Sequence, residues 1–251
     1  MIDWHIFHKR ETLSTNTDAR AGRHGDVFIA DFQTAGRGRL DHKWLSDRGE
    51  NLMMSAVLDV AALDVAHAAT LPLAAGLAVV KTVSAYLGAG ADVKLKWPND
   101  VYVTGLKIAG ILCERVGDNV IVGIGINVRQ KRFPEEISTR ATSLELNGSL
   151  ASVDEVRDAL LKNLSAVYEA WGDGGFEAVY PEISSVDWLR DREVSVMQTD
   201  GDSEPISGRC GGIAPDGSLI IGGRSVWAGE AHICLPRNYG QRIKFFFFFF
   251  L

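Results

Sequence analysis

The sequence contains few cysteines, and they form no recognisable motif. Its three cysteines are Cys113, Cys210 and Cys234, and no two of them have CxxC spacing. A disulfide-rich secreted domain or a zinc site requires more cysteines at closer spacing. The cysteines therefore predict reduced thiols in a cytosol, without a disulfide framework.

Long apolar runs and an excess of positive charge are missing as well. The first residues, "MIDWHIFHKRE", lack the apolar stretch of a signal peptide, and no segment reaches the length of a membrane span. The formal net charge of −6 argues against the basic face with which proteins bind duplex nucleic acid. We expect a soluble cytoplasmic protein without affinity for a membrane or for DNA.

The composition is otherwise that of a globular protein, with 46% hydrophobic and 23% charged residues among 251. This length is sufficient for one large domain with a smaller one attached. The C-terminus carries an unbroken phenylalanine run, Phe245–Phe250, which is too short to span a bilayer and favours aggregation where it is exposed. We assign no function to this tail, residues 237–251.

Hydrophobic patterning predicts both strands and helices in the first three quarters of the chain. Strands are expected at 1–7, 26–33, 51–60, 92–97 and 119–128, and a hairpin over 100–116 turns at Thr104-Gly105. Gly123 and Gly125 are expected to break the last strand. Helices are expected from Ser14 or Thr15 to Gly22 or Gly25, over 64–87, and from a capping box at Ser152 and Glu155 to about Trp171.

The pattern changes at about Asp191 to short strands separated by glycine-rich turns, with a hairpin signal at Asp216-Gly217. This change predicts a domain boundary within 186–190. We expect a larger α+β domain over 1–187 and a small all-β domain over 188–236.

The densest cluster of flexible backbone and positive charge is the segment "GRGR", which ends at Arg39. Glycines allow backbone N–H groups to approach an anion, and the forked guanidinium groups of Arg37 and Arg39 suit a carboxylate or a phosphate. In a loop the two arginines can converge on one ligand. The spacing matches neither a P-loop nor a dinucleotide fingerprint. An ordinary exposed basic turn remains the alternative.

Three further segments have candidate site residues. In "KWPND", Asn99 and Asp100 follow a strand end, where clefts are common, whereas the preceding tryptophan fits a core position. Lys107 lies among apolar residues and needs a partner, unless it is an edge-strand lysine that reaches solvent. In "GIGIN", two glycines on one face indicate the close approach of a ligand or of another backbone, and Asn127 supplies the polar end.

Taken together, these motifs resemble those of the biotin protein ligases. The resemblance rests on "STN", "QTAGRGR", Trp44, "GENL", "KWPND", "KIAGIL", "GIGIN" and a late "GE", in that order, and it covers roughly residues 12–235. It implies a catalytic domain with a central mixed β-sheet flanked by helices, like that of class II synthetases, and a C-terminal SH3-like β-barrel. It also implies the conversion of biotin and ATP, with Mg²⁺, to biotinyl-5′-AMP. Biotin is then transferred to one lysine of a biotin carboxyl carrier protein.

The resemblance assigns roles to individual residues. Adenylation joins two anions, so that fixed cations are needed, and Arg37, Arg39 and Lys107 are the expected catalytic residues. Metal ligands are left unassigned. The residues implied for biotin are Ser14, Thr15, Asn16, Gln33, Gly36, Arg37, Gly38, Arg39, Lys107 and Gly110. Those implied for ATP or the adenylate are Arg37, Arg39, Trp44, Asn99, Asp100, Lys107 and Asn127.

The chain departs from the family pattern in two places. After "GRGR" many members have a further Gly and Arg, but here Leu40, Asp41 and His42 follow, which bears on how the loop closes. Few residues precede Ser14, so that no helix-turn-helix module is expected. A lipoate or octanoate ligase or transferase and a non-catalytic biotin-binding regulator are the rival functions. The sequence leaves the choice between monomer and homodimer open.

Overall fold

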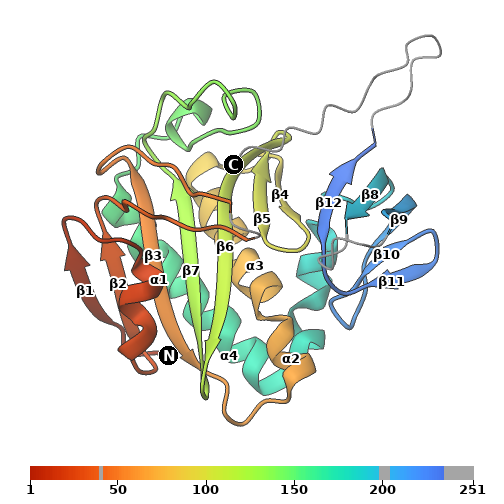
Figure 1. Cartoon of the computed structure of the whole chain (residues 1–251), viewed down its shortest axis with the longest axis horizontal. Helices are drawn as coiled ribbons and strands as arrows, with labels where there is room; N and C mark the ends of the chain where they lie inside the picture. The colour runs from red at the N-terminus through yellow and green to blue at the C-terminus, as the bar shows by residue number, and fades with distance from the viewer. Residues whose placement is uncertain (40–41, 198–203, 235–251) are drawn as a thin grey trace.

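The computed structural model describes residues 1–39, 42–197 and 204–234, so the phenylalanine run and the proposed tail lie outside the described residues. A seven-stranded mixed sheet forms the centre of the molecule, in the order β1-β2-β3-β7-β6-β5-β4 (Figure 1). Only the β1–β2 pair is parallel among the paired neighbours of this described sheet. The strands are β1 His5–Lys9, β2 Asp26–Ala30, β3 Asn51–Asp59, β4 Val93–Lys96, β5 Asp100–Val103, β6 Leu106–Val116 and β7 Asn119–Asn127.

The two faces of this sheet differ because side chains alternate along each strand. Leu52, Met54, Val122, Ile124 and Ile126 belong to the main hydrophobic core. The residues between them in β3 and β7 lie on the opposite face, where Ser55 pairs with Gly123 and Met53 with Gly125. The two glycines leave space on that face, which the side chains of Asn16 and Trp44 enter.

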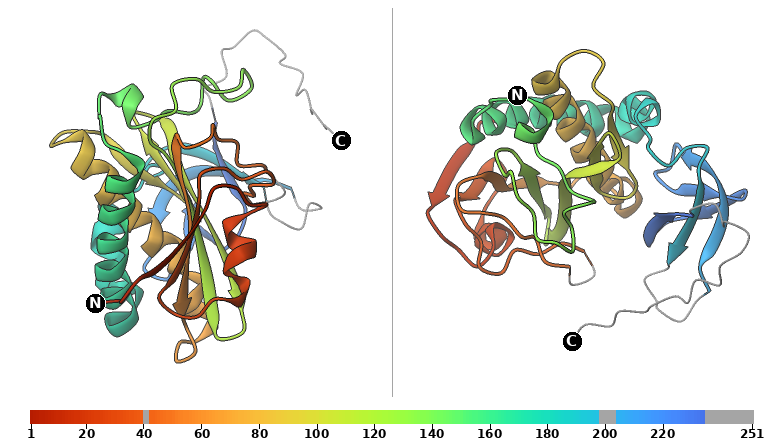
Figure 2. Two further views of the ribbon diagram at one scale, coloured as in Figure 1. Left: turned by 90° about the vertical axis from the view of Figure 1, so that its left-hand side faces the viewer. Right: turned by 90° about the horizontal axis from the view of Figure 1, so that it is seen from above.

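Helices α3 (Leu71–Leu87) and α4 (Val153–Ser185) cover the apolar face, and Figure 2 shows them on one side of the sheet with the short helix α1 (Thr15–Asp18) on the other. The prediction of one helix over 64–87 was wrong, since a break at Thr70 divides it. Pro72 explains the break, because it lacks an N–H and its ring would clash with the carbonyl one turn earlier in a continuous helix. The segments are α1 Thr15–Asp18, η1 Ala19–Ala21, α2 Val65–Ala69, α3 Leu71–Leu87, η2 Glu145–Asn147 and α4 Val153–Ser185.

Helix α4 begins as predicted and consists of two helical parts. The capping box is present, since the Ser152 hydroxyl accepts a hydrogen bond from the Glu155 N–H while the Glu155 carboxylate accepts one from the Ser152 N–H. A kink at Gly175, where φ is 71°, ends the first helical part close to the predicted end near Trp171. A second helical part, which was not predicted, continues to Ser185. No helix among the described residues is long and apolar enough to cross a bilayer.

The hairpin predicted over 100–116 is confirmed, with positive φ at Thr104 and Gly105. The prediction that Gly123 and Gly125 break the last strand was wrong, because both glycines lie inside strand β7, which pairs without interruption with β3 and β6. Cross-strand hydrogen bonding needs no side chain, so that glycines in a central strand leave its pairing intact. The first strand is His5–Lys9 and not 1–7.

A second sheet of five antiparallel strands follows in the order β11-β10-β9-β8-β12 and lies beside the first (Figure 1). The hairpin predicted at Asp216-Gly217 joins β9 to β10, whereas β11 was not predicted. Residues 186–188 pair with Leu95 at the edge of the large sheet, so the connection is itself part of that sheet. The division at 187 stays a prediction. The strands are β8 Glu193–Met197, β9 Ile206–Ile213, β10 Leu219–Ile221, β11 Arg224–Val226 and β12 Glu230–Ile233.

Candidate active site

A cavity of about 430 Å³ lies on the polar face of the seven-stranded sheet. Its walls come from the N-terminus of α1, the loop 33–45, the loop 133–141 and strand β12 of the small sheet. Every residue predicted for the site lines this cavity except Gly36, which is buried behind it against Gln33 and Trp44. The cavity therefore joins segments that are far apart in the sequence.

A network of polar side chains closes one end of the cavity. The Gln33 carboxamide oxygen accepts hydrogen bonds from the N–H and the hydroxyl of Thr15, at 2.7 and 3.1 Å. Ser55 donates to either Thr15 or Asn16, whose oxygens are 2.7 and 2.6 Å from its hydroxyl. Ser14 is the N-cap of α1, yet its hydroxyl makes no capping hydrogen bond. This end offers oriented donors and acceptors in a largely buried setting.

The paired glycines of the sheet create the space for two of the predicted site residues. A Cβ at Gly125 would lie 2.5 Å from the Trp44 ring, and one at Gly110 would lie 3.3 Å from it. A Cβ at Gly123 would overlap the Asn16 carboxamide. The indole of Trp44 therefore packs directly against the backbone of β6 and β7, because the two glycines have no side chain that would keep it away. Its Nε1 is buried without a hydrogen-bond partner among the described residues.

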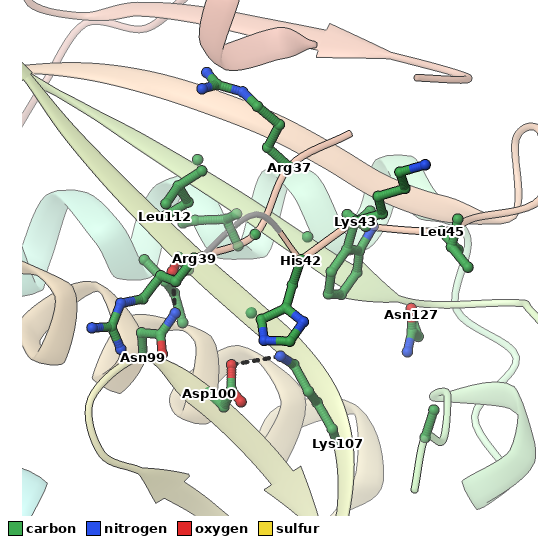
Figure 3. Close-up of a pocket in the computed structure, with 18 of the residues that line it drawn as sticks. Arg37, Arg39, His42, Lys43, Leu45, Asn99, Asp100, Lys107, Leu112 and Asn127 are labelled. Atoms are coloured by element: carbon green, nitrogen blue, oxygen red, sulfur yellow. Dashed lines mark hydrogen bonds and ion pairs between the residues drawn. The ribbon is translucent and has the colours of Figure 1, made fainter. Parts of the chain in front are cut away.

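The two arginines of the loop point in different directions (Figure 3). Arg37 donates to both oxygens of Glu114, at 3.0 and 3.2 Å, and Glu114 also accepts a 2.6 Å hydrogen bond from Asn16. Arg39 extends toward the small sheet and donates to the Gly229 carbonyl at 3.1 Å. The two side chains do not converge in this structure, because each guanidinium has its own partner, and their convergence on one ligand stays a prediction.

Lys107 has the partner that its position required. Its ammonium lies 2.7 Å from the Asp100 carboxylate, and the Asn99 amide donates to the Ile111 carbonyl at 2.7 Å (Figure 3). The Asn127 amide donates to the Thr142 carbonyl at 2.9 Å, which fixes the loop after β7 across the strand end. Asp100 and Lys107 thus form a charged centre in the cavity, whereas Asn99 and Asn127 are engaged with the backbone.

Comparison with known proteins identifies the family. The family described as "Biotin/lipoate A/B protein ligase family" matches residues 9–130. A solved biotin protein ligase from Aquifex aeolicus, in complex with biotin and ATP, is 32% identical, with a TM-score of 0.81. The alignment covers 92% of this chain and 98% of that chain. This chain belongs to the biotin protein ligase family.

Other relatives in the biotin protein ligase family are longer than the aligned region. A biotin–acetyl-CoA-carboxylase ligase from Mycobacterium tuberculosis is 41% identical over 170 residues, which are 64% of this chain and 63% of that protein. A bifunctional ligase/repressor from Escherichia coli, BirA, is 32% identical over 204 residues, which are 78% and 61% of the two chains. The alignments therefore span less than two thirds of these curated relatives.

The structure adds cavity residues that the resemblance to biotin protein ligases left unassigned. Burial lowers the pKa of Lys96 and raises that of Tyr102, which stand at the end of the cavity nearest the small sheet. Burial also lowers the pKa of the Arg39 guanidinium, although Asp100 and Glu230 oppose the shift. Ser55 and Glu114 support the polar end from below. Both residues alternate along their strands with core residues. The register of β3, β6 and β7 would therefore have placed them on the cavity side of the sheet.

No group of three or more His, Cys, Asp or Glu side chains is placed to hold a metal ion within the described ranges. The carboxylate of Asp100 faces Lys107, that of Glu114 faces Arg37, and that of Glu230 lies 3.5 Å from His42. Mg²⁺ commonly binds through one or two carboxylates together with substrate phosphates, so that a complete protein cage is not required. Asp100 and Glu230 are compatible with that arrangement.

Proposed function

We propose that this protein activates biotin with ATP to biotinyl-5′-AMP and transfers biotin to a specific lysine of a biotin carboxyl carrier protein. The observation that carries the proposal is one cavity in which a neutral, polar end adjoins a charged end. Ser14, Thr15 and Gln33 supply the first, and Lys107 and Arg39 belong to the second. The net charge of the whole chain is −6, so that the positive charge of the cavity is a local feature, which the binding of anionic substrates would explain.

The polar end suits the uncharged ureido ring of biotin, which presents N–H donors and a carbonyl acceptor. Thr15 and Asn16 are held in place by Gln33, Ser55 and Glu114, so that their remaining donors and acceptors are oriented before a ligand arrives. Preorganised polar groups bind without the entropic cost of ordering them.

The charged end suits the adenylation step. A biotin carboxylate oxygen attacks the α-phosphorus of ATP, a new P–O bond forms, and the bond to the β-phosphate breaks as pyrophosphate leaves. Both reactants are anions, so that Lys107 and Arg39 would lower the repulsion between them and stabilise the charge that develops. Mg²⁺, when bound with the triphosphate, would neutralise part of its charge.

The loop would then protect the product. Biotinyl-5′-AMP is a mixed anhydride that hydrolyses or reacts with stray amines unless the cavity is closed. Arg37, Gly38 and Arg39 belong to the segment that would close over it, Trp44 would border the adenine, and Asp100 would lie near the incoming lysine amine. The transfer forms an amide and releases AMP.

The site itself favours biotin over the rival substrates. The matching family also contains lipoate ligases, which act on a flexible apolar chain ending in a dithiolane ring. The buried polar network of Asn16, Gln33 and Ser55 would leave unpaired groups beside such a ring, at a cost of about 1–3 kcal/mol each. A carrier protein of a biotin-dependent carboxylase in the cytoplasm is the proposed partner. A monomer and a homodimer are both compatible with the site.

The proposal is tested by incubating the protein with biotin, ATP, Mg²⁺ and a purified biotin carboxyl carrier domain. Intact-mass analysis is expected to show one added biotinyl group, and a carrier whose acceptor lysine is replaced by arginine serves as the control. The proposal is supported if the wild-type carrier is modified and the control carrier is not. No modification by folded protein contradicts it.

A further inference from the structure

His42 belongs to the loop 33–45 and lines the open side of the cavity. Its side chain is 67% exposed, and its Nε2 lies 3.5 Å from the Glu230 carboxylate of β12. Figure 3 shows the His42 ring pointing from the loop toward the Asp100–Lys107 pair. The imidazole therefore stands between solvent and the charged centre, where a side chain that enters the cavity from outside would meet it.

Two contacts hold this part of the loop against the small sheet. The Arg39 guanidinium donates to the Gly229 carbonyl at 3.1 Å, and His42 faces Glu230, the next residue of the small sheet. Within the loop, the Gly38 N–H donates to the His42 carbonyl at 2.6 Å. The backbone of His42 is thus fixed by its own loop and its ring by the neighbouring sheet, so that the imidazole is held at the cavity.

His42 is also a departure from the family pattern. Many members have a further Gly and Arg after "GRGR", whereas this chain has His42 at the end of that stretch. An arginine keeps its proton at neutral pH, whereas a neutral imidazole accepts one. His42 is therefore capable of proton transfer, which an arginine is not.

The transfer half-reaction has a chemical requirement that the residues assigned so far do not meet. The acceptor lysine of a carrier is protonated at neutral pH, where roughly one amine in a few thousand is neutral. An ammonium has no lone pair with which to attack an acyl carbon. Arg37 and Arg39 keep their own protons, and the Asp100 carboxylate is engaged by Lys107 at 2.7 Å. A carboxylate is also a weak proton acceptor near neutral pH, whereas an imidazole is well matched to it.

The contact with Glu230 suits the imidazole of His42 to this task. A neutral imidazole with its proton on Nε2 has its lone pair on Nδ1. With Nε2–H directed at the Glu230 carboxylate, Nδ1 is the atom that accepts a proton. The same carboxylate then stabilises the imidazolium that results, as the orienting group does for a base in other enzymes.

The charged groups around His42 suit the approach of an ammonium. The Asp100 and Glu230 carboxylates both act on Arg39, where they oppose the lowering of its pKa by burial, so that they share one part of the cavity. They attract an incoming lysine, whereas the cations remain with the anionic adenylate. Further titratable groups of the cavity come from the loop, β4, β5, β6 and β12, namely Lys43, Lys96, Tyr102, Lys107 and His232.

We propose that His42 is the general base of the transfer half-reaction and takes a proton from the acceptor lysine of the carrier protein. This proposal rests on the proposed function. Once His42 has taken one proton from the ammonium, the amine lone pair attacks the acyl carbon of biotinyl-5′-AMP and the C–N bond forms. The bond between that carbon and the phosphate oxygen breaks, and its electron pair leaves with AMP. The nitrogen loses its second proton to water as the amide forms.

The test compares His42→Ala and His42→Arg with the control His8→Ala. His8 is also an exposed histidine beside a carboxylate, 2.6 Å from Asp31, and it lies on β1, outside the residues that line the cavity. One assay mixes excess protein with synthetic biotinyl-AMP and the carrier domain over a range of pH, without ATP or Mg²⁺. A second measures biotin-dependent pyrophosphate release without the carrier. A third measures the thermal midpoint.

For His42→Ala we expect transfer at neutral pH to slow by about 10- to 100-fold, at the lower end of what general base catalysis contributes, because water reaches the exposed site. Adenylate formation stays within about threefold of wild type, since the base has no part in that half-reaction. The thermal midpoint is unchanged, because the ring is exposed. His42→Arg keeps a cation beside Glu230 but accepts no proton, so that it shows the same loss in transfer. The control His8→Ala matches wild type in all three assays.

The pH dependence separates a base from a residue with a structural role. In the wild type, the transfer rate rises with pH while the base loses its proton and then levels off. In His42→Ala the rate follows the neutral fraction of the acceptor amine, which keeps increasing with pH. The deficit of the variant therefore shrinks as the pH rises.

Transfer by His42→Ala at the wild-type rate would overturn the role of His42 while leaving the proposed function intact. A loss that His42→Arg restores would also overturn it, because charge alone would then account for the effect. A loss that is equal in both half-reactions and constant with pH assigns His42 a structural role, with the same consequence. Wild-type protein that is inactive with ATP and with supplied biotinyl-AMP would contradict the proposed function itself, and the His42 role with it.

Discussion

The Arg37 guanidinium lies 3.0 Å from the Glu114 carboxylate, an ion pair that joins the loop to the far part of β6. The same carboxylate accepts a hydrogen bond from Asn16, so that a loop residue and a cavity residue share one anion. If Arg37 closes over a bound carboxylate or phosphate, it must leave this contact. Glu114 and the ligand then compete for one guanidinium.

Glu114→Gln tests that competition. The glutamine oxygen still accepts from Asn16, but the charge that holds Arg37 is gone. We expect biotin to bind about twofold to fivefold more tightly, because one charge-assisted contact no longer opposes closure; such a contact on a partly exposed pair contributes about 1 kcal/mol or less. Isothermal titration with biotin measures the change. The effect should disappear in the Arg37→Met background, and weaker binding by Glu114→Gln would contradict the competition.

Gly123→Ala tests the support of Asn16. The new methyl group overlaps the Asn16 carboxamide, which must shift away from Ser55 and Glu114. We expect a loss of about 1–3 kcal/mol in the free energy of unfolding and a loss of about tenfold or more in biotin affinity. Gly172→Ala is the matched control, because it is a helical glycine with nothing within 4 Å of the added Cβ. Denaturant unfolding and biotin titration measure both quantities, and equal affinity in the two variants would remove Asn16 from the site.

Lys107→Ala separates charge stabilisation from binding. The side chain is 35% exposed and its pair with Asp100 is accessible to water, so that we expect a change in unfolding free energy of about 1 kcal/mol or less. The rate of adenylate formation should fall by about a hundredfold or more, because a cation aimed at developing charge is lost. Biotin affinity should change much less. Single-turnover kinetics and biotin titration measure the two effects, and an unaltered rate would exclude Lys107 from the reaction.

Arg39→Gly should loosen the loop that covers the product. Arg39 ties the loop to the small sheet through the Gly229 carbonyl, and a glycine adds backbone freedom as well. We expect the open population to increase by about tenfold, because a charge-assisted hydrogen bond contributes about 1.5–3 kcal/mol. Activated biotin would then escape and label bystander lysines.

Blotting for biotin on an unrelated lysine-rich protein measures this escape. Arg48→Ala is the control, because Arg48 lies farther along the same connection and pairs with Glu11 at the surface. Arg39→Gly that still makes biotinyl-AMP, yet labels the bystander no more than wild type does, would show that Arg39 does not retain the product.

The sequence predicted which residues meet in the site better than it predicted their contacts. The resemblance to biotin protein ligases, carried by the motif order, implied that Thr15, Gln33 and Lys107 belong to one site, and all three line one cavity in the structure. The partner of Arg37 was not foreseen, because Glu114 lies 77 positions away and only the register of β6 brings it to the polar face. Sequence periodicity gives the face of a residue but not which residue of another strand lies opposite.

Helix boundaries were predicted less well for a related reason. Local signals located the capping box at Ser152, which acts over one turn. The end of α4 at Ser185 depends on packing of its last turns, including the buried Ile183, against the rest of the core. Gly175 ends the first helical part of α4, whereas tertiary packing overrides the preference of Pro181 against a helix in the second. The division of α2 from α3 at Thr70 has a local cause, Pro72, which the prediction of one helix did not take into account.

The most direct test of the central claim is pyrophosphate release by wild-type protein with ATP and Mg²⁺, measured with biotin, with lipoate and with neither. The account predicts release that depends on biotin, appears with lipoate at the background rate, and accompanies biotinyl-5′-AMP in equal amount. Release that lipoate supports as well as biotin does, or no biotin-dependent release from folded protein, would contradict it.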